Sequence, residues 1–188
     1  MSAIAIATLK SLSPIQFGRM YCVEKNDKEQ PAAYEIRTWR ERAHYDEKGM
    51  LFIPPMCFKK SLEGAAAFLS MQIKGRGKAT YTKHFLAGVL VMDPVPLPVH
   101  KDRVRGLWLN VPHDGRRGGR SRVPKCFPVV DLWEGQVTYH ILDGIITEPI
   151  FTRHLIEAGN FIGILSFRAE RGGYFGRYEV KNVKWQEN

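Results

Sequence analysis

Two segments of the chain have the apolar spacing of amphipathic helices. In the first, apolar side chains stand at positions 58, 62, 65, 66, 69 and 73, close to the 3.6-residue period of a helix. Pro54 and Pro55 precede it, and a helix start tolerates proline because its first N–H groups have no partner. In the second, Thr147 can cap a helix that stops at Gly159. The pattern predicts one helix that ends before Gly75 and a second over 148–158.

Other segments have the patterns of β-strands. Residues 33–42 and 178–185 interleave polar side chains with aromatic or β-branched ones, which is the period-two pattern of a half-buried strand. The run at 85–92 is almost entirely apolar, as in a buried central strand. For residues 1–30 we expect an N-terminal arm or edge strand followed by a loop. Shorter strands are expected at positions 51–53, 137–142 and 161–167.

The order of these elements predicts the fold class. It is close to a βαββαβ plan, which is the α+β, ferredoxin-like arrangement of RNA-recognition (RRM) domains, with an antiparallel sheet and two helices. Residues 99–128 interrupt this order of elements, and we expect them to form a basic hairpin insertion. A chain of 188 residues with 44% hydrophobic residues is expected to form a single domain over 1–188. The topology alone does not identify a function, because it hosts many.

The positive charge of the chain is concentrated in one segment. The whole sequence has 28 Lys and Arg against 19 Asp and Glu, a formal net charge of +9. Residues 74–125 contain 12 of the basic side chains and only 3 acidic ones, whereas the rest of the chain is balanced. Such a localised excess indicates binding to a polyanion, and to nucleic acid in particular. The alternative is a solvated surface that keeps the protein soluble.

Several classes of protein are disfavoured by the sequence. The three cysteines are widely spaced, which argues against a disulfide framework or a cysteine zinc site and favours reduced thiols in the cytoplasm. The six histidines form no metal-binding motif, and the segment 75–80 lacks the spacing of a phosphate-binding loop. No run of 18 apolar residues occurs, so no membrane helix is expected. We therefore expect no cofactor, no metal and no membrane partner.

Two motifs carry chemistry that suits a nucleic acid. Residues 168–177 combine three glycines with arginines and two aromatic side chains, so that main-chain N–H groups could approach phosphates while an aromatic ring stacks on a base. A tight turn with inward aromatics is the structural alternative. Residues 51–67 join a strand to a helix start that carries two lysines. With the basic middle segment, the candidate contacts are Lys59, Lys60, Lys74, Arg76, Lys78, Arg116, Arg117, Arg120, Arg122, Arg168, Arg171, Gly172, Gly173, Tyr174, Phe175 and Arg177.

Together the two motifs resemble those of the RAMP superfamily, the RNA-recognition-fold subunits of CRISPR effector complexes. Ile53 and Pro54, with Lys59 or Lys60 close behind, are similar to the family's Ile-Pro-Gly-Ser-Ser-Leu-Lys-Gly signature, although Pro-Met-Cys replaces Gly-Ser-Ser. The segment 172–177 resembles the family's glycine-rich loop, which a strand follows. The resemblance extends over about residues 34–184, and the N-terminal 30 residues and the middle insertion match no motif.

The resemblance implies an RNA-binding backbone subunit that grips guide-RNA phosphates and self-assembles along the RNA. Its implied partners are guide RNA, target RNA or single-stranded DNA, further copies of the chain and other effector subunits. Residues 99–128 would form the thumb-like hairpin of such a subunit. The chain is short for a backbone subunit, which suggests a minimal or phage-borne version. A phage-encoded mimic that interferes with a CRISPR complex would keep the same RNA-binding residues, so it remains an alternative.

The resemblance also raises the alternative of an RNA endonuclease. Some members of the family cleave RNA with an aspartate in a loop before the Ile-Pro turn, and Asp46 stands in the corresponding stretch with His44 nearby as a candidate base. An aspartate that accepts N–H bonds in a turn is far commoner. We therefore expect no catalytic activity. A basic structural protein that assembles without nucleic acid is the remaining interpretation.

Overall fold

The computed structural model describes residues 2–113 and 121–187. Its main sheet has four antiparallel strands in the order β4 (Val89–Val91), β8 (Glu134–Ile141), β1 (Ala3–Ser11) and β9 (Tyr178–Glu187). Helix α2 (Pro55–Leu69) lies between β1 and β4 in the chain, and helix α4 (Glu148–Glu157) lies between β8 and β9. This is the βαββαβ ferredoxin-like arrangement, so the predicted fold class is confirmed.

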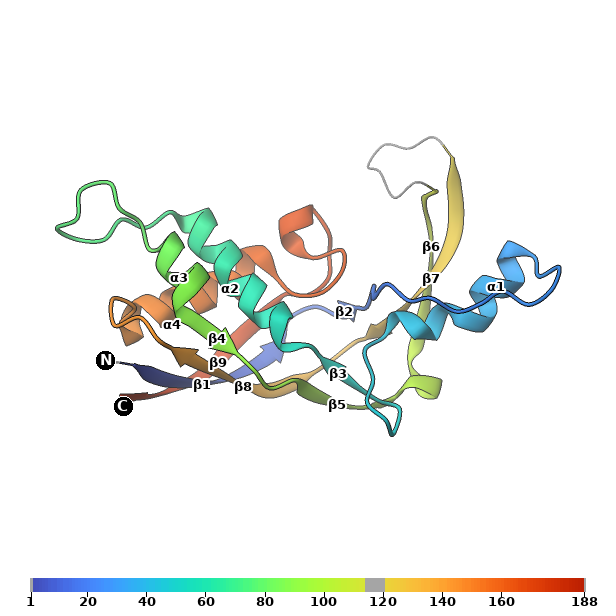
Figure 1. Ribbon diagram of the computed structural model, residues 1–188, viewed down its shortest axis with the longest axis horizontal. Coiled ribbons are helices and arrows are strands. Elements are labelled where there is room, and N and C mark those ends of the chain that lie inside the picture. The colour runs from blue at the N-terminus through green and yellow to red at the C-terminus, as the bar shows by residue number, and fades with distance from the viewer. Residues whose placement is uncertain (1, 114–120, 188) are drawn as a thin grey trace.

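The two helices cover one face of this sheet (Figure 1). On the central strand β1, Ala3, Ala5, Ala7 and Leu9 are buried on the helix side. Small alanines on the central strand allow the helices to pack close to the sheet. Larger side chains fill the space from the neighbouring elements, among them Tyr139, Phe151 and Tyr178. The main core therefore lies between the sheet and the α2–α4 layer.

A second group of strands combines segments inserted between β4 and β8 with segments that lie between β1 and α2 in the chain. Strand β5 (Val95–His100) pairs with β3 (Met50–Ile53), and β6 (Arg105–Pro112) pairs with β7 (Arg122–Val130) to form a long hairpin. The short strand β2 (Ile15–Gln16) joins β7. In Figure 1 the β6–β7 hairpin rises from the end of the molecule that also holds helix α1 (Pro31–Thr38).

A buried carboxylate attaches α1 to this hairpin. Glu35 is 2% exposed and accepts hydrogen bonds from both terminal nitrogens of Arg42, at 2.6 and 3.1 Å. It also accepts from Lys125 Nζ at 3.0 Å and from the Cys126 N–H at 2.8 Å, both on β7. Burial opposes the charge on Glu35, but these hydrogen bonds outweigh it and lower the pKa. A satisfied ion pair therefore fixes the base of the hairpin.

The remaining helical elements are short. Helix α3 (Thr82–Gly88) follows the loop after α2, and single turns lie at η1 (Trp39–Arg42), η2 (Lys101–Arg103) and η4 (Ala169–Arg171). A π-helical turn, η3 (Ala158–Ile162), continues α4. None of the helices in the described part of the chain is long and apolar enough to cross a membrane.

Several predicted elements were wrong. Residues 33–42 form a helical segment. The side chains that point inward are Glu35, Thr38, Trp39 and Arg42, and their positions have the spacing of a helix. The pattern was misread because Glu35 and Arg42 form a buried ion pair and were counted as exposed residues. Residues 3–11 form a central strand of the main sheet and not an arm or edge strand.

Two other predicted strands also differ. Only the last part of 85–92 is a strand, because helix α3 runs to Gly88. The segment 161–167 is not a strand, since Gly163, Leu165 and Phe167 have positive φ values of 74°, 62° and 49°. Residues with positive φ cannot continue a β-strand.

Candidate nucleic-acid interface

A groove crosses the helix face of the molecule and brings the two sequence motifs together. Its volume is about 530 Å³, and it lies between α2, α3 and the loop of residues 163–177, which we call the glycine-rich loop. The lining residues from α2 include Lys60, Glu63 and Gly64, and those from the glycine-rich loop include Arg168 and Glu170. The start of helix α2 and the glycine-rich loop are about 100 residues apart in the sequence, so the fold alone creates this juxtaposition.

The glycines of the loop are required by the loop's own packing. A Cβ atom at Gly173 would lie 1.7 Å from the carbonyl oxygen of Phe167, and one at Gly176 would lie 2.1 Å from that of Ile164. The N–H groups of Gly172 and Gly173 donate to the carbonyls of Ala169 and Arg168. The sequence-based expectation that these two N–H groups are free for phosphates is therefore not met, and the loop offers mainly side chains.

The arginines of the loop differ in their exposure and in the hydrogen bonds that they make within the protein. Arg168 donates to Glu170 Oε2 from Nε and Nη2, at 3.0 and 2.6 Å, and Arg177 donates from Nε to the Asn160 carbonyl at 3.1 Å. The Arg171 side chain is 73% exposed and only approaches Glu170, at 3.8 Å. Arg171 is therefore the most accessible cation of this loop.

The two aromatic residues of the loop form a surface pair. Tyr174 is 65% exposed, and its ring meets the ring of Phe175 edge-on at 5.6 Å between centroids. Tyr174 therefore presents a ring to solvent, as a stacking role requires, and Phe175 supports it.

The two neighbouring lysines of α2 have different environments. Lys59 is buried, and its Nζ donates to the carbonyls of Phe85 and Leu86 at the end of α3 and pairs with Glu63 at 2.7 Å. Its three donors are therefore used within the protein, so Lys59 serves as a structural group. The Lys60 side chain is 58% exposed and lines the groove, where it pairs with Glu63 at 2.6 Å.

The groove contains acidic residues that the sequence analysis overlooked. Partial burial opposes the charge on Glu63, but hydrogen bonds from Lys59 and Lys60 outweigh it and lower the pKa of this carboxyl. Glu170 holds Arg168 in the same way on the opposite wall. The i,i+3 spacing of Lys60 and Glu63 is the sequence signal that could have revealed one of these pairs.

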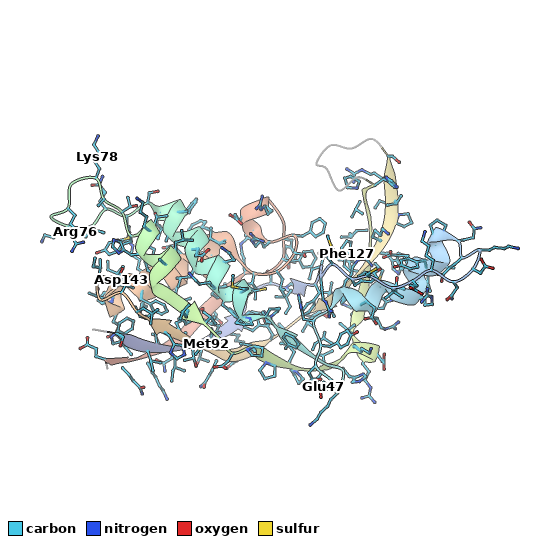
Figure 2. All side chains as sticks on the ribbon, in the orientation of Figure 1. Glu47, Arg76, Lys78, Met92, Phe127 and Asp143 are labelled. Carbon is cyan, nitrogen blue, oxygen red and sulfur yellow. The ribbon has the colours of Figure 1, made fainter. Side chains whose placement is uncertain are left out.

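The loop between α2 and α3 carries the next basic cluster. Lys74, Arg76 and Lys78 are exposed, and within the described residues none of them has an ion pair. Figure 2 shows Arg76 and Lys78 at the tip of this loop, at the end of the molecule away from the β6–β7 hairpin. This loop therefore offers uncompensated positive charge beside the helix layer.

The β6–β7 hairpin carries the rest of the predicted basic contacts. Arg122 is exposed and donates from Nη1 to the Asn110 carbonyl across the hairpin at 3.0 Å. Arg116, Arg117 and Arg120 lie outside the described residues. At the base of the hairpin, Figure 2 labels Phe127, whose ring meets Phe167 of the glycine-rich loop edge-on at 5.6 Å. The hairpin and the glycine-rich loop are therefore in direct contact.

Asp46 and His44 do not form a catalytic arrangement with the groove residues. Asp46 Oδ1 accepts N–H bonds from Lys48 and Met50, both at 2.9 Å, which is the usual structural role of aspartate in a turn. His44 packs between the rings of Phe17 and Phe52, and burial together with nearby Arg19 lowers its pKa. Figure 2 places Glu47, the neighbour of Asp46, at the sheet side of the molecule, away from the groove.

The open face of the sheet lacks the features of a classical RNA-recognition surface. The outward residues of β1 are Ile4, Ile6, Thr8 and Lys10, and their cross-strand partners are His140, Thr138, Gln136, Glu134, Gln186, Lys184, Asn182 and Glu179. None of them is Phe, Tyr or Trp. RNA-recognition domains use such aromatic rings on the sheet to stack bases. The helix face is therefore the better candidate for the interface.

The described residues contain no cluster suited to a metal ion: among residues 2–113 and 121–187, no three His, Cys, Asp or Glu side chains come together in a way that could hold one. The Cys57 thiol faces the groove, and burial raises its pKa to about 11. A thiol with a raised pKa is a poor nucleophile at neutral pH. The groove is therefore suited to binding by charge and contact.

Comparison with known proteins identifies similar structures. No protein-family model and no curated protein sequence matches the chain. Cmr6 from Pyrococcus furiosus is 13% identical to it, with a TM-score of 0.50 over 96% of this chain and 99% of Cmr6. A chain of a CRISPR RNA-guided surveillance complex is 10% identical, with a TM-score of 0.40 over 97% of this chain and 68% of that one. The likeness to Cmr6 shows the fold.

Proposed function

We propose that this chain binds the phosphate backbone of single-stranded RNA across its helix face, as a non-catalytic subunit of a CRISPR-type ribonucleoprotein. The observation that carries the proposal is a groove with charged side chains in its walls and three projections on the same side of the sheet. The loop with Lys74, Arg76 and Lys78, the glycine-rich loop and the β6–β7 hairpin all lie on the helix side of the sheet (Figure 1).

The charge distribution supports a polyanion as the ligand. The net charge of +9 comes from residues 74–125, which contribute the first and the third of these projections. Phosphate contacts from Lys and Arg supply most of the sequence-independent affinity for nucleic acids. The fold shared with Cmr6 and the two RAMP-like motifs support RNA as the polyanion; of these motifs, Lys60 lines the groove, and residues 172–177 follow shortly after its lining residues Arg168 and Glu170.

The ion pairs in the groove define how the contact would form. Lys60 and Arg168 are held by Glu63 and Glu170, so a phosphate must compete with a carboxylate for each cation. The Arg171 side chain is 73% exposed and pairs with Glu170 only at 3.8 Å, so it can attract the strand first, together with the exposed loop of Lys74, Arg76 and Lys78. Binding of this kind is expected to be strongly salt-dependent.

Partners other than RNA follow from the same proposal. A subunit of this fold is expected to contact further copies of itself or other effector subunits along a guide RNA. A phage-encoded mimic would bind RNA with the same residues, so the RNA contact is the part of the proposal to be tested first. We propose no cleavage, because Asp46 Oδ1 accepts two backbone N–H bonds in a turn and His44 is packed between two aromatic rings.

Fluorescence anisotropy with a labelled single-stranded RNA, measured over a series of salt concentrations, tests the proposal. The double variant Lys60→Gln/Arg171→Gln should bind about threefold to tenfold more weakly, and the slope of log affinity against log salt should fall by about 0.7 for each phosphate that the variant no longer neutralises. The matched control is Lys181→Gln/Lys184→Gln on strand β9, which should bind like the wild-type chain. Equally weakened binding in both variants, or no binding of the wild-type chain at low salt, would contradict the proposal.

A further inference from the structure

Two exposed phenylalanines form a stacked pair on the helix face. Phe68 near the end of α2 is 61% exposed, and Phe161 in the π-helical turn η3 is 51% exposed. Their ring centroids are 5.2 Å apart, and the ring planes differ by 26°. Aromatic rings that are more than half exposed contribute little to the core, so the pair is unexplained by folding alone.

The close approach of two elements holds the pair in place. Gly64 lies one turn before Phe68 on α2, and a Cβ atom there would stand 2.9 Å from Ile162 Cγ2. The missing side chain allows α2 to pack directly against η3, which brings the two rings together. The π-helical turn sets the direction of Phe161, and such turns occur often at functional sites.

The pair continues the groove described above. Gly64 and Ala67 line the groove, and Phe68 follows them on the same helix. Gly163 and Ile164 line its other wall, two and three residues after Phe161. Phe68 and Phe161 are not lining residues themselves, but both stand beside the lining in the chain, so we expect a strand in the groove to reach the two rings.

The surroundings of the pair are polar and cationic. Ser70 and Asn160 are exposed polar neighbours of the pair in the chain. Arg177 donates from Nε to the carbonyl of Asn160, the residue before Phe161, and the loop with Lys74, Arg76 and Lys78 begins just after α2. Aromatic rings flanked by cations are the arrangement that single-stranded nucleic acids require, with rings for bases and cations for phosphates.

We propose that Phe68 and Phe161 form a stacking platform for a nucleobase of the strand that occupies the groove. The inference rests on the proposed RNA binding and adds a base-contacting site to it. Stacking uses the flat face of any base, so the platform recognises the presence of a base and not its identity. The favoured occupant is thus an unpaired base of a single strand, whereas an aromatic side chain of a protein partner is the competing occupant.

A double-mutant cycle between protein and ligand tests this site. The variant Phe68→Leu/Phe161→Leu keeps apolar bulk but removes the ring faces, and the ligands are an adenine 12-mer and an abasic 12-mer with the same phosphates. The variant should bind the adenine strand about tenfold more weakly than the wild-type chain does and the abasic strand equally well. Phe68→Tyr/Phe161→Tyr, which retains the rings, should restore the affinity for the adenine strand.

The outcomes separate this inference from the proposed function. If the wild-type chain binds both strands but the leucine variant loses nothing, the platform is overturned while RNA binding stands, and a protein partner becomes the better occupant. Equal losses on both strands would mean that the substitutions disturb the fold, and this would also overturn a base-specific role. If the wild-type chain binds neither strand, the proposed function itself fails. A strand with 2-aminopurine should in addition lose fluorescence on binding to the wild-type chain and retain it with the leucine variant.

Discussion

Lys59 and Lys60 show at the scale of single residues how neighbours in a motif can have opposite roles. Either lysine could correspond to the family lysine in the sequence, but only Lys60 faces the groove, whereas Lys59 is buried against the end of α3. The sequence could identify the motif but could not show which lysine is buried, since that depends on where α3 packs against α2.

Substitution of the two lysines should separate stability from binding. Lys59→Met should lower the free energy of unfolding by about 3 kcal/mol, because two carbonyls and Glu63 lose a buried donor. Lys60→Met should change it by less than about 0.5 kcal/mol, as is usual for an exposed ion pair, and should weaken RNA binding. Urea unfolding and anisotropy measure the two effects, and similar stability losses in both variants would contradict the assignment.

Glu170 is expected to restrain RNA binding. Glu170→Gln removes the negative charge that holds Arg168 and attracts Arg171, so the affinity for single-stranded RNA at low salt should rise about threefold. Glu134→Gln on strand β8 is the matched control, because Glu134 is exposed and has no ion pair among the described residues. Anisotropy measures the change. A lower affinity of Glu170→Gln would indicate that Glu170 positions the arginine for binding and does not compete with the phosphate.

His154 should make the stability depend on pH. It is fully buried between α4 and α3, its ring centroid lies 4.3 Å from that of Phe85, and burial is the main reason that its pKa is lowered from 6.5. The unfolded chain therefore binds a proton at a higher pH than the folded chain does. The free energy of unfolding should fall as the pH drops below about 6.5, by at most about 1.4 kcal/mol per pH unit from this group.

Urea unfolding at pH 7.5 and 5.5 measures this effect. His154→Leu should show a weaker dependence on pH over this window, although His44, whose pKa is also lowered, keeps part of it. An unchanged dependence in the leucine variant would exclude His154 as the titrating group. Carboxylates such as Glu35, whose pKa is lowered, act below about pH 4.5 and so lie outside the window.

At the scale of elements, the sequence predicted the two large helices and failed where polar residues are buried. Helices α2 and α4 have simple apolar faces, and both were predicted, although α2 ends at Leu69, one turn before the predicted end. Helix α1 was missed because its buried positions include Glu35, which a hydrophobic pattern counts as exposed. Strand β1 was missed as a central strand because it is almost wholly apolar, which hides the period of two.

The glycine-rich loop should tolerate no side chain at Gly173. Gly173→Ala places a Cβ atom against the Phe167 carbonyl, so the loop must shift, and we expect a loss of about 2 kcal/mol in stability together with weaker RNA binding. Gly75→Ala is the control, because a Cβ atom there meets nothing within 4 Å and only the φ of +79° causes strain, of about 1 kcal/mol. Urea unfolding and anisotropy of both variants measure these effects. Wild-type behaviour of Gly173→Ala would contradict the packing described here.

At the scale of the whole molecule, the topology was predictable and the shape of the interface was not. The ferredoxin-like plan was predicted correctly, although its first strand was placed at 33–42 and is in fact at Ala3–Ser11, and the two motifs were expected to act together. Their meeting across one groove, and the carboxylates that occupy it, depend on contacts between segments about 100 residues apart. Such long-range contacts leave no local period in the sequence.

The choice between the two faces of the sheet is the central claim of this account. The helix face has the groove, the stacked rings and the basic projections, whereas the outward residues of β1 and their cross-strand partners include no Phe, Tyr or Trp. A conventional RNA-recognition domain would use the opposite face.

Photo-crosslinking of a 4-thiouridine RNA to the full chain, followed by mass spectrometry of the crosslinked peptides, tests this claim most directly. We expect crosslinks in the glycine-rich loop, in α2 and at Phe68 or Phe161. Crosslinks confined to the outward residues of β1, β8 and β9, or no crosslink at low salt, would contradict it.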